Sequence, residues 1–197
     1  MSVSTLRPAP AAPSLRERVV RAAVELTAQA GWSRVTMAGL ANQVGVSRQT
    51  VYNEIGTKAG LAEAMILHEL ERFLGVVTAA FDAHPDDLVA AIETASRDVL
   101  TVARGNQLLH AVVSATHGAD TDLLPLLTTH SHSLLTVAKA VILERIPPDD
   151  VPLEGEHLEA AIDMIVRVVL SHVMQPTASP ESTARDLAWI AARVLQA

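Results

Sequence analysis

Two short amphipathic segments on either side of a glycine, within residues 36–61 (TMAGLANQVGVSRQTVYNEIGTKAGL), constrain the fold more than any other stretch of the chain. Apolar residues recur at helical spacing in the first segment, and Gly45 then interrupts the pattern where a tight turn requires a residue that tolerates positive φ. Ser47 follows as the N-cap of a second segment with helical spacing. The sequence therefore predicts two short helices, over residues 37–44 and 48–55, joined by a sharp turn.

The second predicted helix presents a polar face at its start. Its apolar residues fall on the inward side, and the outward side carries Arg48, Gln49, Thr50, Tyr52 and Asn53. Arginine can form two hydrogen bonds with guanine, and glutamine or asparagine can do the same with adenine. Helix-turn-helix proteins present this part of their second helix to base edges in the major groove. We therefore predict that these five residues contact DNA.

The segment LANQVGVSRQTVYNEIGTKAGL resembles the DNA-binding segment of the TetR family of transcriptional regulators. The resemblance is carried by Gly45-Val46-Ser47, by Thr50-Val51-Tyr52 and by Lys58, which opens the next helix. It implies an all-α, nine-helix TetR-like fold. In that fold an N-terminal three-helix helix-turn-helix head is attached to a C-terminal helical body for ligand binding and dimerisation.

The resemblance also implies phosphate contacts for Thr36 and Tyr52, although Thr36 is equally suited to acting only as the N-cap of its helix. Lys58 occupies a first helical turn, which the helix dipole makes unfavourable for a cation unless a phosphate lies opposite. Two positions depart from the family pattern. Ile55 replaces the usual aromatic residue, and Ala59-Gly60 replaces the usual acidic residue, so packing at the start of this helix is expected to differ.

An amphipathic helix pair joined by glycine also occurs as ordinary core packing in all-α proteins. Here a turn glycine, an N-cap serine, an exposed polar face and a lysine at the start of the next helix occur together. Each signal is weak by itself, but their combination favours DNA binding over packing alone.

Charge is distributed unevenly along the chain. The net charge of the 197 residues is −7, but residues 1–58 hold seven basic and three acidic residues, so this part carries +4 and the remainder carries −11. A small basic head on an acidic body suits DNA binding, because phosphate contacts need only local positive charge. Arg16, Arg18 and Arg21 are expected to be solvated or to lie near the DNA backbone.

The remaining sequence indicates three regions, which are a flexible tail over residues 1–13, a helix-turn-helix DNA-binding domain over 14–60 and a ligand-binding and dimerisation domain over 61–197. Ser14 and Glu17 form the pattern of a capping box. We call the two predicted helices over residues 37–44 and 48–55 the reading pair. Other helices are expected over residues 15–30, 58–80, 88–103, 106–117, 125–146 and 157–173, and from residue 180 onward. Residues 147–156 are expected to form a loop.

The last two expected helices, over residues 157–173 and from residue 180, carry more apolar surface than one small body can bury. They predict a homodimer that packs through these two helices, as the resemblance also implies. Two heads about one DNA turn (~34 Å) apart, or a multiple of it, would match a pseudo-palindromic operator.

The body offers mainly aliphatic residues, one phenylalanine and several histidines for a ligand pocket. This composition favours a small hydrophobic effector with one polar end, such as a fatty acid or an acyl thioester, over an aromatic or cationic drug. The candidate ligand-binding residues are Phe73, His110, Val113, His117, Leu134, Met164 and Val168.

Other classes of function have less support. His110 and His117 are seven residues apart rather than four, and His130 and His132 diverge by about 200° on a helix, so we expect neither a metal site nor another cofactor. The chain has no glycine-rich phosphate loop, nucleophile motif or HExxH motif. The favoured function is that of a ligand-responsive repressor. An all-α enzyme and a DNA-binding protein without an effector are the alternatives.

The sequence also bears on the compartment. It contains no cysteine, which excludes disulfides and thiolate metal sites and gives no information on the redox compartment. No apolar run approaches the ~20 residues of a membrane span, and the first residues lack the apolar stretch of a signal peptide. A cytoplasmic protein without membrane contact is expected.

Overall fold

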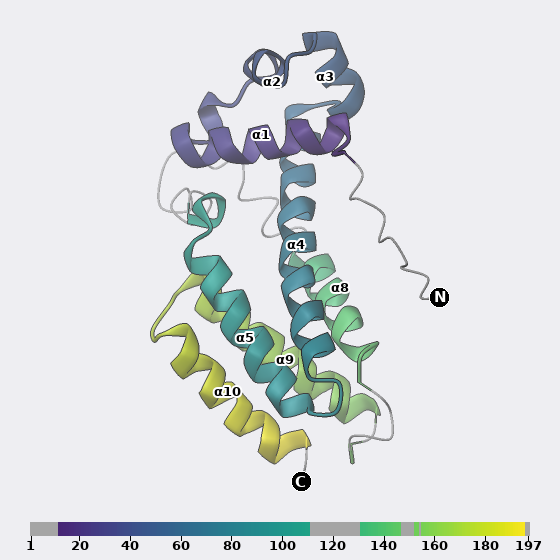
Figure 1. Ribbon diagram of the computed structural model, residues 1–197, viewed down its shortest axis with the longest axis vertical. Helices are drawn as coiled ribbons and strands as arrows, with labels where there is room; N and C mark the ends of the chain where they lie inside the picture. Colours follow the sequence, from purple (N-terminus) through teal and green to yellow (C-terminus); the bar gives the residue numbers. More distant parts are fainter. Residues whose placement is uncertain (1–11, 111–130, 147–151, 154, 196–197) are drawn as a thin grey trace, which may run out of the picture. The chain divides into compact units, whose positions relative to one another are not determined.

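The computed structural model describes residues 12–110, 131–146, 152–153 and 155–195, and helices are the only regular elements in these ranges (Figure 1). The chain divides into two compact units between Met65 and Ile66, within the longest described helix. The all-α fold class predicted from the sequence is confirmed for this part of the chain. None of the described helices is long and apolar enough to cross a membrane.

The first unit contains α1 (Leu15–Ala30), the 3-10 helix η1 (Trp32–Arg34), α2 (Met37–Val44), α3 (Arg48–Ile55) and the first turns of α4 (Lys58–Ala83). The predicted capping box opens α1, because the Glu17 amide donates to Ser14 Oγ at 3.2 Å and the Ser14 amide donates to the Glu17 carboxylate at 2.6 Å. Completely buried aliphatic side chains from each of the four α-helices form the core: Val19, Ala23, Leu40, Val51 and Leu61.

The turn between α2 and α3 has the geometry that the sequence predicts. Gly45 lies in the left-handed region at φ +76° and ψ +38°, and the amides of Gly45 and Val46 both donate to the Ala41 carbonyl at 3.0 Å. Ser47 Oγ then accepts a hydrogen bond from the Thr50 amide at 3.1 Å and caps α3. The two caps fix where each helix ends and begins, and they therefore fix the direction of α3.

Replacing Gly45 with alanine is expected to lower the free energy of unfolding of the first unit by about 1–2 kcal/mol, because a Cβ is disfavoured in the left-handed region. The chain has two tryptophans, and the buried Trp32 belongs to the first unit whereas Trp189 belongs to the second. Urea unfolding followed by Trp32 fluorescence in a Trp189→Phe background measures the change. Gly45→Asn is the matched control, with a smaller loss because asparagine tolerates this conformation. Equal losses in both variants would contradict the explanation.

The second unit contains the rest of α4 together with α5 (Leu88–Arg104), α8 (Ser131–Leu143), α9 (Gly155–Met174) and α10 (Pro180–Leu195). In Figure 1, α5 lies alongside α10, and α9 contacts both of these helices as well as α8. The core of this unit is again mainly aliphatic and includes Phe81, Ile92, Ile146, Ile162 and Leu195.

Some helix boundaries differ from the predicted ones. α4 continues to Ala83 instead of ending near Ala80, because Ala80 and Phe81 are buried in the core and extend the apolar face by another turn. α9 begins at Gly155, inside the expected loop. Residues 107–110 are helical, as expected for the start of the helix after α5, but the rest of that helix and Pro125 lie outside the described residues.

An ion pair connects α8 to α9 at the surface of the second unit. Lys139 Nζ lies 3.0 Å from Asp163 Oδ1, and Arg167 pairs with the other oxygen of the same carboxylate. The hydrogen bond from Arg167 and then that from Lys139 hold the pKa of Asp163 below its ordinary value. This carboxylate therefore keeps its negative charge between two cations.

Candidate DNA-binding and ligand-binding sites

The exposed face of α3 carries two ordered pairs of side chains, each one helical turn apart. The Gln49 side-chain amide donates to Asn53 Oδ1 at 3.0 Å. The Arg48 guanidinium lies 5.4 Å from the centre of the Tyr52 ring, and its Nη2 donates to the Tyr52 hydroxyl at 3.4 Å. All four side chains are exposed, so their remaining donors and acceptors are available to a partner.

The other predicted DNA-contacting residues take part in helix starts. Thr50 is half-buried, and its hydroxyl lies 2.7 Å from that of Ser47 in the cap of α3. The exposed Thr36 caps α2 by accepting a hydrogen bond from the Gly39 amide at 3.0 Å. The ammonium of Lys58 lies 4.8 Å from the centre of the Trp32 ring, which is a cation–π distance. This contact holds a positive charge at the start of α4.

The departure from the family pattern at Gly60 has a steric explanation. A Cβ at this position would lie 2.9 Å from the carbonyl oxygen of Ile55, at the end of α3. The Gly60 amide also donates to Thr57 Oγ1 at 3.0 Å, which caps α4. The absence of a side chain therefore permits the close approach between α4 and the end of α3.

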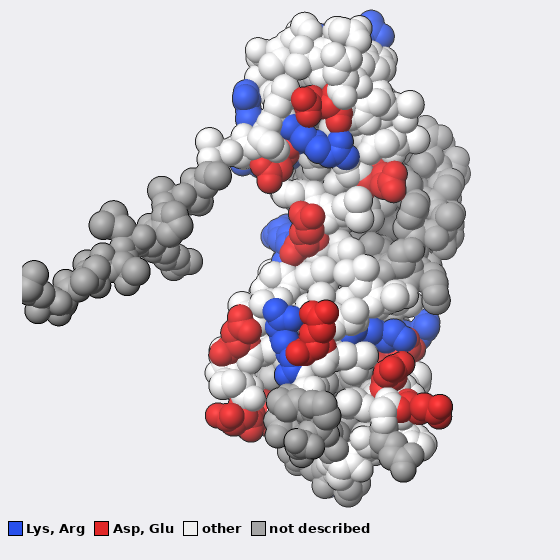
Figure 2. Space-filling model, turned by 90° about the vertical axis from the view of Figure 1, so that its right-hand side faces the viewer, with Lys and Arg blue, Asp and Glu red and all other residues white. Residues whose placement is uncertain are grey.

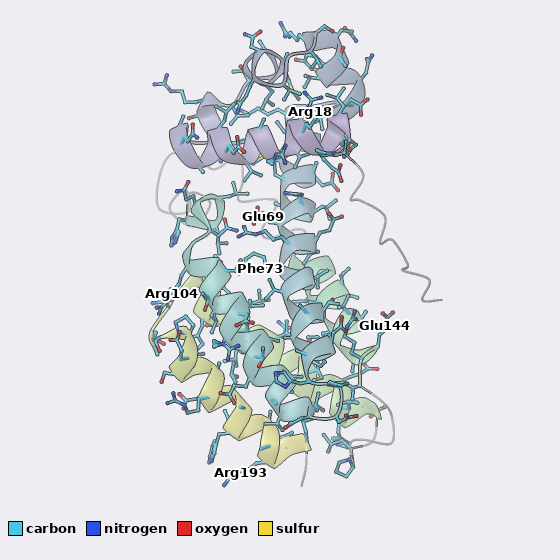
Figure 3. All side chains as sticks on the ribbon, in the orientation of Figure 1. Arg18, Glu69, Phe73, Arg104, Glu144 and Arg193 are labelled. Atoms are coloured by element: carbon cyan, nitrogen blue, oxygen red, sulfur yellow. The ribbon has the colours of Figure 1, made fainter. Side chains whose placement is uncertain are left out.

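Arg16 and Arg18 are exposed to solvent, as expected, and each also donates a hydrogen bond within the first unit that the sequence did not predict. Arg18 Nη2 donates to the Val44 carbonyl at 2.7 Å, and Arg16 Nη1 donates to the Glu54 carbonyl at 2.6 Å. Arg18 is labelled in Figure 3. Both acceptors lie in the last turns of α2 and α3, where carbonyls lack partners within the helix. The two arginines thus attach α1 to both helices of the reading pair.

Arg18→Ala is expected to lower the free energy of unfolding of the first unit by about 1 kcal/mol, because it removes a charged hydrogen bond to an exposed carbonyl. Arg21→Ala is the matched control, since Arg21 is also an exposed arginine on α1 but has no hydrogen bond in the described structure. The control is expected to change stability by less than about 0.5 kcal/mol. The Trp32 fluorescence assay measures both variants, and equal effects would contradict the anchoring role of Arg18.

A cavity of about 270 Å³ lies within the second unit between α4, α5, α8 and α9. We call it the aliphatic cavity, because most of its lining is aliphatic. Its lining includes Leu70, Phe73, Val77, Ile92, Val99, Ile142, Ile162, Val166 and Val169. Its volume is close to the lower end of the range of small-molecule sites, about 300–1,000 Å³.

The structure brings only part of the predicted ligand set to this cavity. Phe73 lines it, and Figure 3 shows this side chain projecting from α4 toward α5. His110 is exposed and does not line it, and its ring Nε2 lies 2.9 Å from the Arg104 carbonyl. Val113 and His117 lie outside the described residues, as does the side chain of Leu134.

Met164 and Val168 do not line the aliphatic cavity, because they lie on a different side of α9. Ile162, Val166 and Val169 of the same helix line it instead. The sequence could not select among these residues, because α9 is apolar around most of its circumference and its spacing does not single out one buried face.

Exposed apolar side chains remain on the last two helices of the second unit. Met164 is 63% exposed and Trp189 is 59% exposed, which are high values for large apolar residues. We define the exposed apolar face as Met164, Val168, Trp189, Ile190 and Val194. The guanidinium of Arg193 lies 4.5 Å from the centre of the Trp189 ring and covers part of that ring.

On the face drawn in Figure 2, the basic side chains of the second unit lie among acidic ones and form no continuous strip. Arg48 on α3 is an exposed arginine without an ion pair in the described part of the chain, and it is suited to base contact. The capped glycine turn and the polar exposed face of α3 are the features of a helix-turn-helix DNA-binding unit. The aliphatic cavity in the second unit suits a small ligand. Together these features define the class of helix-turn-helix transcriptional regulators with a ligand-binding body.

Comparisons with known proteins agree with this class. The model of bacterial regulatory proteins of the tetR family matches residues 19–65, and that of the bacterial tetracycline repressor C-terminal domain matches residues 87–193. The HTH-type transcriptional regulator AlkX of Mycobacterium tuberculosis is 30% identical over 174 residues, which cover 88% of this chain and 82% of that protein. The chain belongs to the TetR family of transcriptional regulators.

Solved structures show the same relationship. The crystal structure of the TetR family repressor AlkX from Dietzia sp. strain DQ12-45-1b superposes with a TM-score of 0.72 at 29% identity, and covers 93% of this chain and 96% of that one. The multidrug binding protein EbrR, at 18% identity and a TM-score of 0.60, shares the fold over 93% of this chain and 96% of its own. Proteins of this family are DNA-binding, dimeric, effector-responsive regulators and not enzymes.

Proposed function

We propose that this protein is a cytoplasmic, homodimeric repressor that a small hydrophobic effector releases from a pseudo-palindromic operator. In this proposal residues 14–60 bind DNA, and residues 61–197 bind the effector and dimerise. The observation that carries it is that one continuous helix, α4, begins in the reading unit and then lines the aliphatic cavity.

The DNA contacts follow from the exposed face of α3 and the adjacent helix starts. Arg48, Gln49 and Asn53 offer donors and acceptors for base edges, and the ordered pairs reduce the side-chain entropy lost on binding. Tyr52, Thr50 and the residues at helix starts, Thr36 and Lys58, are the proposed phosphate contacts.

The exposed apolar face is the proposed dimer interface, as expected from the apolar content of the last two helices. It combines a methionine and a tryptophan, which are enriched in interface cores, with an arginine stacked on the tryptophan. Two copies related by a twofold axis would bring the same residues together from both protomers. A dimer would present two reading helices to two halves of one operator.

The proposed effector carries an aliphatic chain, because the described lining of the aliphatic cavity consists mainly of Leu, Ile and Val side chains, with Phe73 and Phe81 as its rings. The fatty acids and acyl thioesters that the sequence analysis favours as effectors also contain an aliphatic hydrocarbon chain. The related AlkX of Dietzia is implicated in the biodegradation of n-alkanes, which are also aliphatic chains. Among the residues predicted to bind the ligand, Phe73 lines this cavity, and we propose that it contacts the effector.

Selection from a random double-stranded DNA library at fixed salt tests the proposal. The purified protein is expected to enrich an inverted repeat whose half-site centres are about 10 base pairs, or a multiple, apart. Enrichment of a single half-site would contradict the dimeric arrangement, and no enriched sequence would contradict specific DNA binding. An excess of unrelated DNA controls for nonspecific phosphate binding.

A further inference from the structure

The polar side chains of the aliphatic cavity restrict which head group its ligand can carry. Among the described lining residues the polar ones are Glu69, Ser96 and Asn106, and none is a lysine, arginine or histidine. Figure 3 shows Glu69 and Phe73 projecting from the same side of α4. The charged group that lines the cavity in the described part of the chain is therefore a carboxylate.

The Glu69 carboxylate is positioned by two donors. Asn106, which is only 4% exposed, donates its side-chain amide to Glu69 Oε2, and Arg72 Nη1 lies 3.3 Å from the same oxygen. The side-chain oxygen of Asn106 accepts a hydrogen bond from the Leu109 amide at 2.9 Å. Asn106 is therefore fixed by partners on both sides, while Glu69 retains acceptor capacity, because a carboxylate can accept about four hydrogen bonds.

Ser96 of α5 is the second polar position in the cavity wall. It is 4% exposed, and its hydroxyl makes no hydrogen bond in the described part of the chain. A neutral hydroxyl can donate or accept, but it does not offset the negative charge of Glu69. The Arg72 guanidinium, which is half exposed and does not line the cavity, offsets the charge of Glu69 only in part. A ligand carboxylate in this cavity would therefore still face a like charge in a mainly apolar surrounding, where such repulsion is poorly screened.

We infer that the aliphatic cavity selects a neutral aliphatic ligand whose head group donates a hydrogen bond, a primary alcohol, over the corresponding carboxylate. The alcohol proton is donated to the Glu69 carboxylate, and the chain packs on the Leu, Ile and Val lining. This inference rests on the proposed function of the cavity as the effector site, and it narrows the head groups expected from the sequence.

Calorimetric titration of the full-length protein with three ligands of equal chain length tests the inference. Decan-1-ol donates a hydrogen bond, its methyl ether 1-methoxydecane cannot donate, and decanoate carries a negative charge. Decan-1-ol is expected to bind about 3- to 10-fold more tightly than the ether, because one hydrogen bond is lost, and at least about 10-fold more tightly than decanoate. Equal or tighter binding of decanoate or of the ether would overturn the inference.

Glu69→Gln is the decisive variant, because glutamine can still accept the hydrogen bond from Asn106 but carries no charge. Its ratio of decan-1-ol to decanoate affinity is expected to fall by at least about 10-fold, mainly because decanoate binds more tightly. An unchanged ratio would overturn the role of Glu69. If the wild-type protein binds none of the three ligands, the proposed effector cavity itself fails, which is a different outcome from a reversed order of head groups.

Discussion

Replacing Trp189 with glutamate is expected to weaken dimerisation about a thousandfold and to abolish tight operator binding. Trp189 is a large exposed apolar residue in the exposed apolar face, and Arg193 stacks on its ring. Loss of an interface tryptophan typically costs about 2 kcal/mol or more, and a homodimer loses it from both protomers, or about 4 kcal/mol in total. The introduced carboxylates would also repel each other across a twofold axis.

Sedimentation equilibrium measures the dimer dissociation constant, and operator binding is measured in parallel at the same salt concentration. Leu67→Glu is the matched control, because Leu67 is also an exposed large apolar residue but lies on α4, outside the exposed apolar face. It is expected to leave the dimer intact. A Trp189→Glu protein that remains dimeric at the wild-type dissociation constant would contradict the proposed interface.

Replacing Arg48 with alanine is expected to weaken operator binding by about 1–3 kcal/mol at each half-site and to relax base preference at the position it contacts. The reason is that Arg48 lies exposed on α3, next to Tyr52, with guanidinium donors directed to neither a carboxylate nor a helix end. Lys58→Ala is expected instead to weaken binding to all sequences similarly, because a phosphate contact carries no base information.

Fluorescence anisotropy with the selected operator and with single-base variants separates these two effects at fixed salt. Arg97→Ala is the control for lost positive charge, since Arg97 lies on α5 and pairs with the neighbouring Asp98. It should leave operator affinity nearly unchanged. If Arg48→Ala binds the operator and every base variant with wild-type affinities, α3 is not the reading helix.

The first unit could be predicted closely from the sequence, because its signals are local. Ser14 with Glu17, Gly45 and Ser47 each determine a helix boundary through bonds that span only a few residues, and the structure shows those bonds. The anchoring by Arg16 and Arg18 was not predictable in this way. Their acceptors lie 38 and 26 residues away in the sequence, so no local pattern indicates them.

The lining of the candidate ligand cavity was predicted less completely, because it depends on which side of each helix faces the cavity. Phe73, which was predicted to contact a ligand, lines the cavity, whereas Met164 and Val168 lie on another side of an apolar helix. Glu69 was not among the predicted ligand residues. The sequence does not indicate that Glu69 lies in the cavity wall, because the hydrogen bond that positions its carboxylate comes from Asn106, which is distant in the sequence but adjacent in the fold.

The most direct test of the central claim is whether occupancy of the aliphatic cavity changes operator affinity. Operator binding is measured at fixed salt with and without saturating medium- and long-chain alcohols, fatty acids and acyl thioesters, each shown by calorimetry to bind. A ligand is expected to weaken operator binding about 5- to 150-fold, and the operator must weaken ligand binding by the same factor. Ala95→Leu, which fills part of the cavity, should lose the effect. Ligands that bind in the cavity but leave operator affinity unchanged would contradict the account.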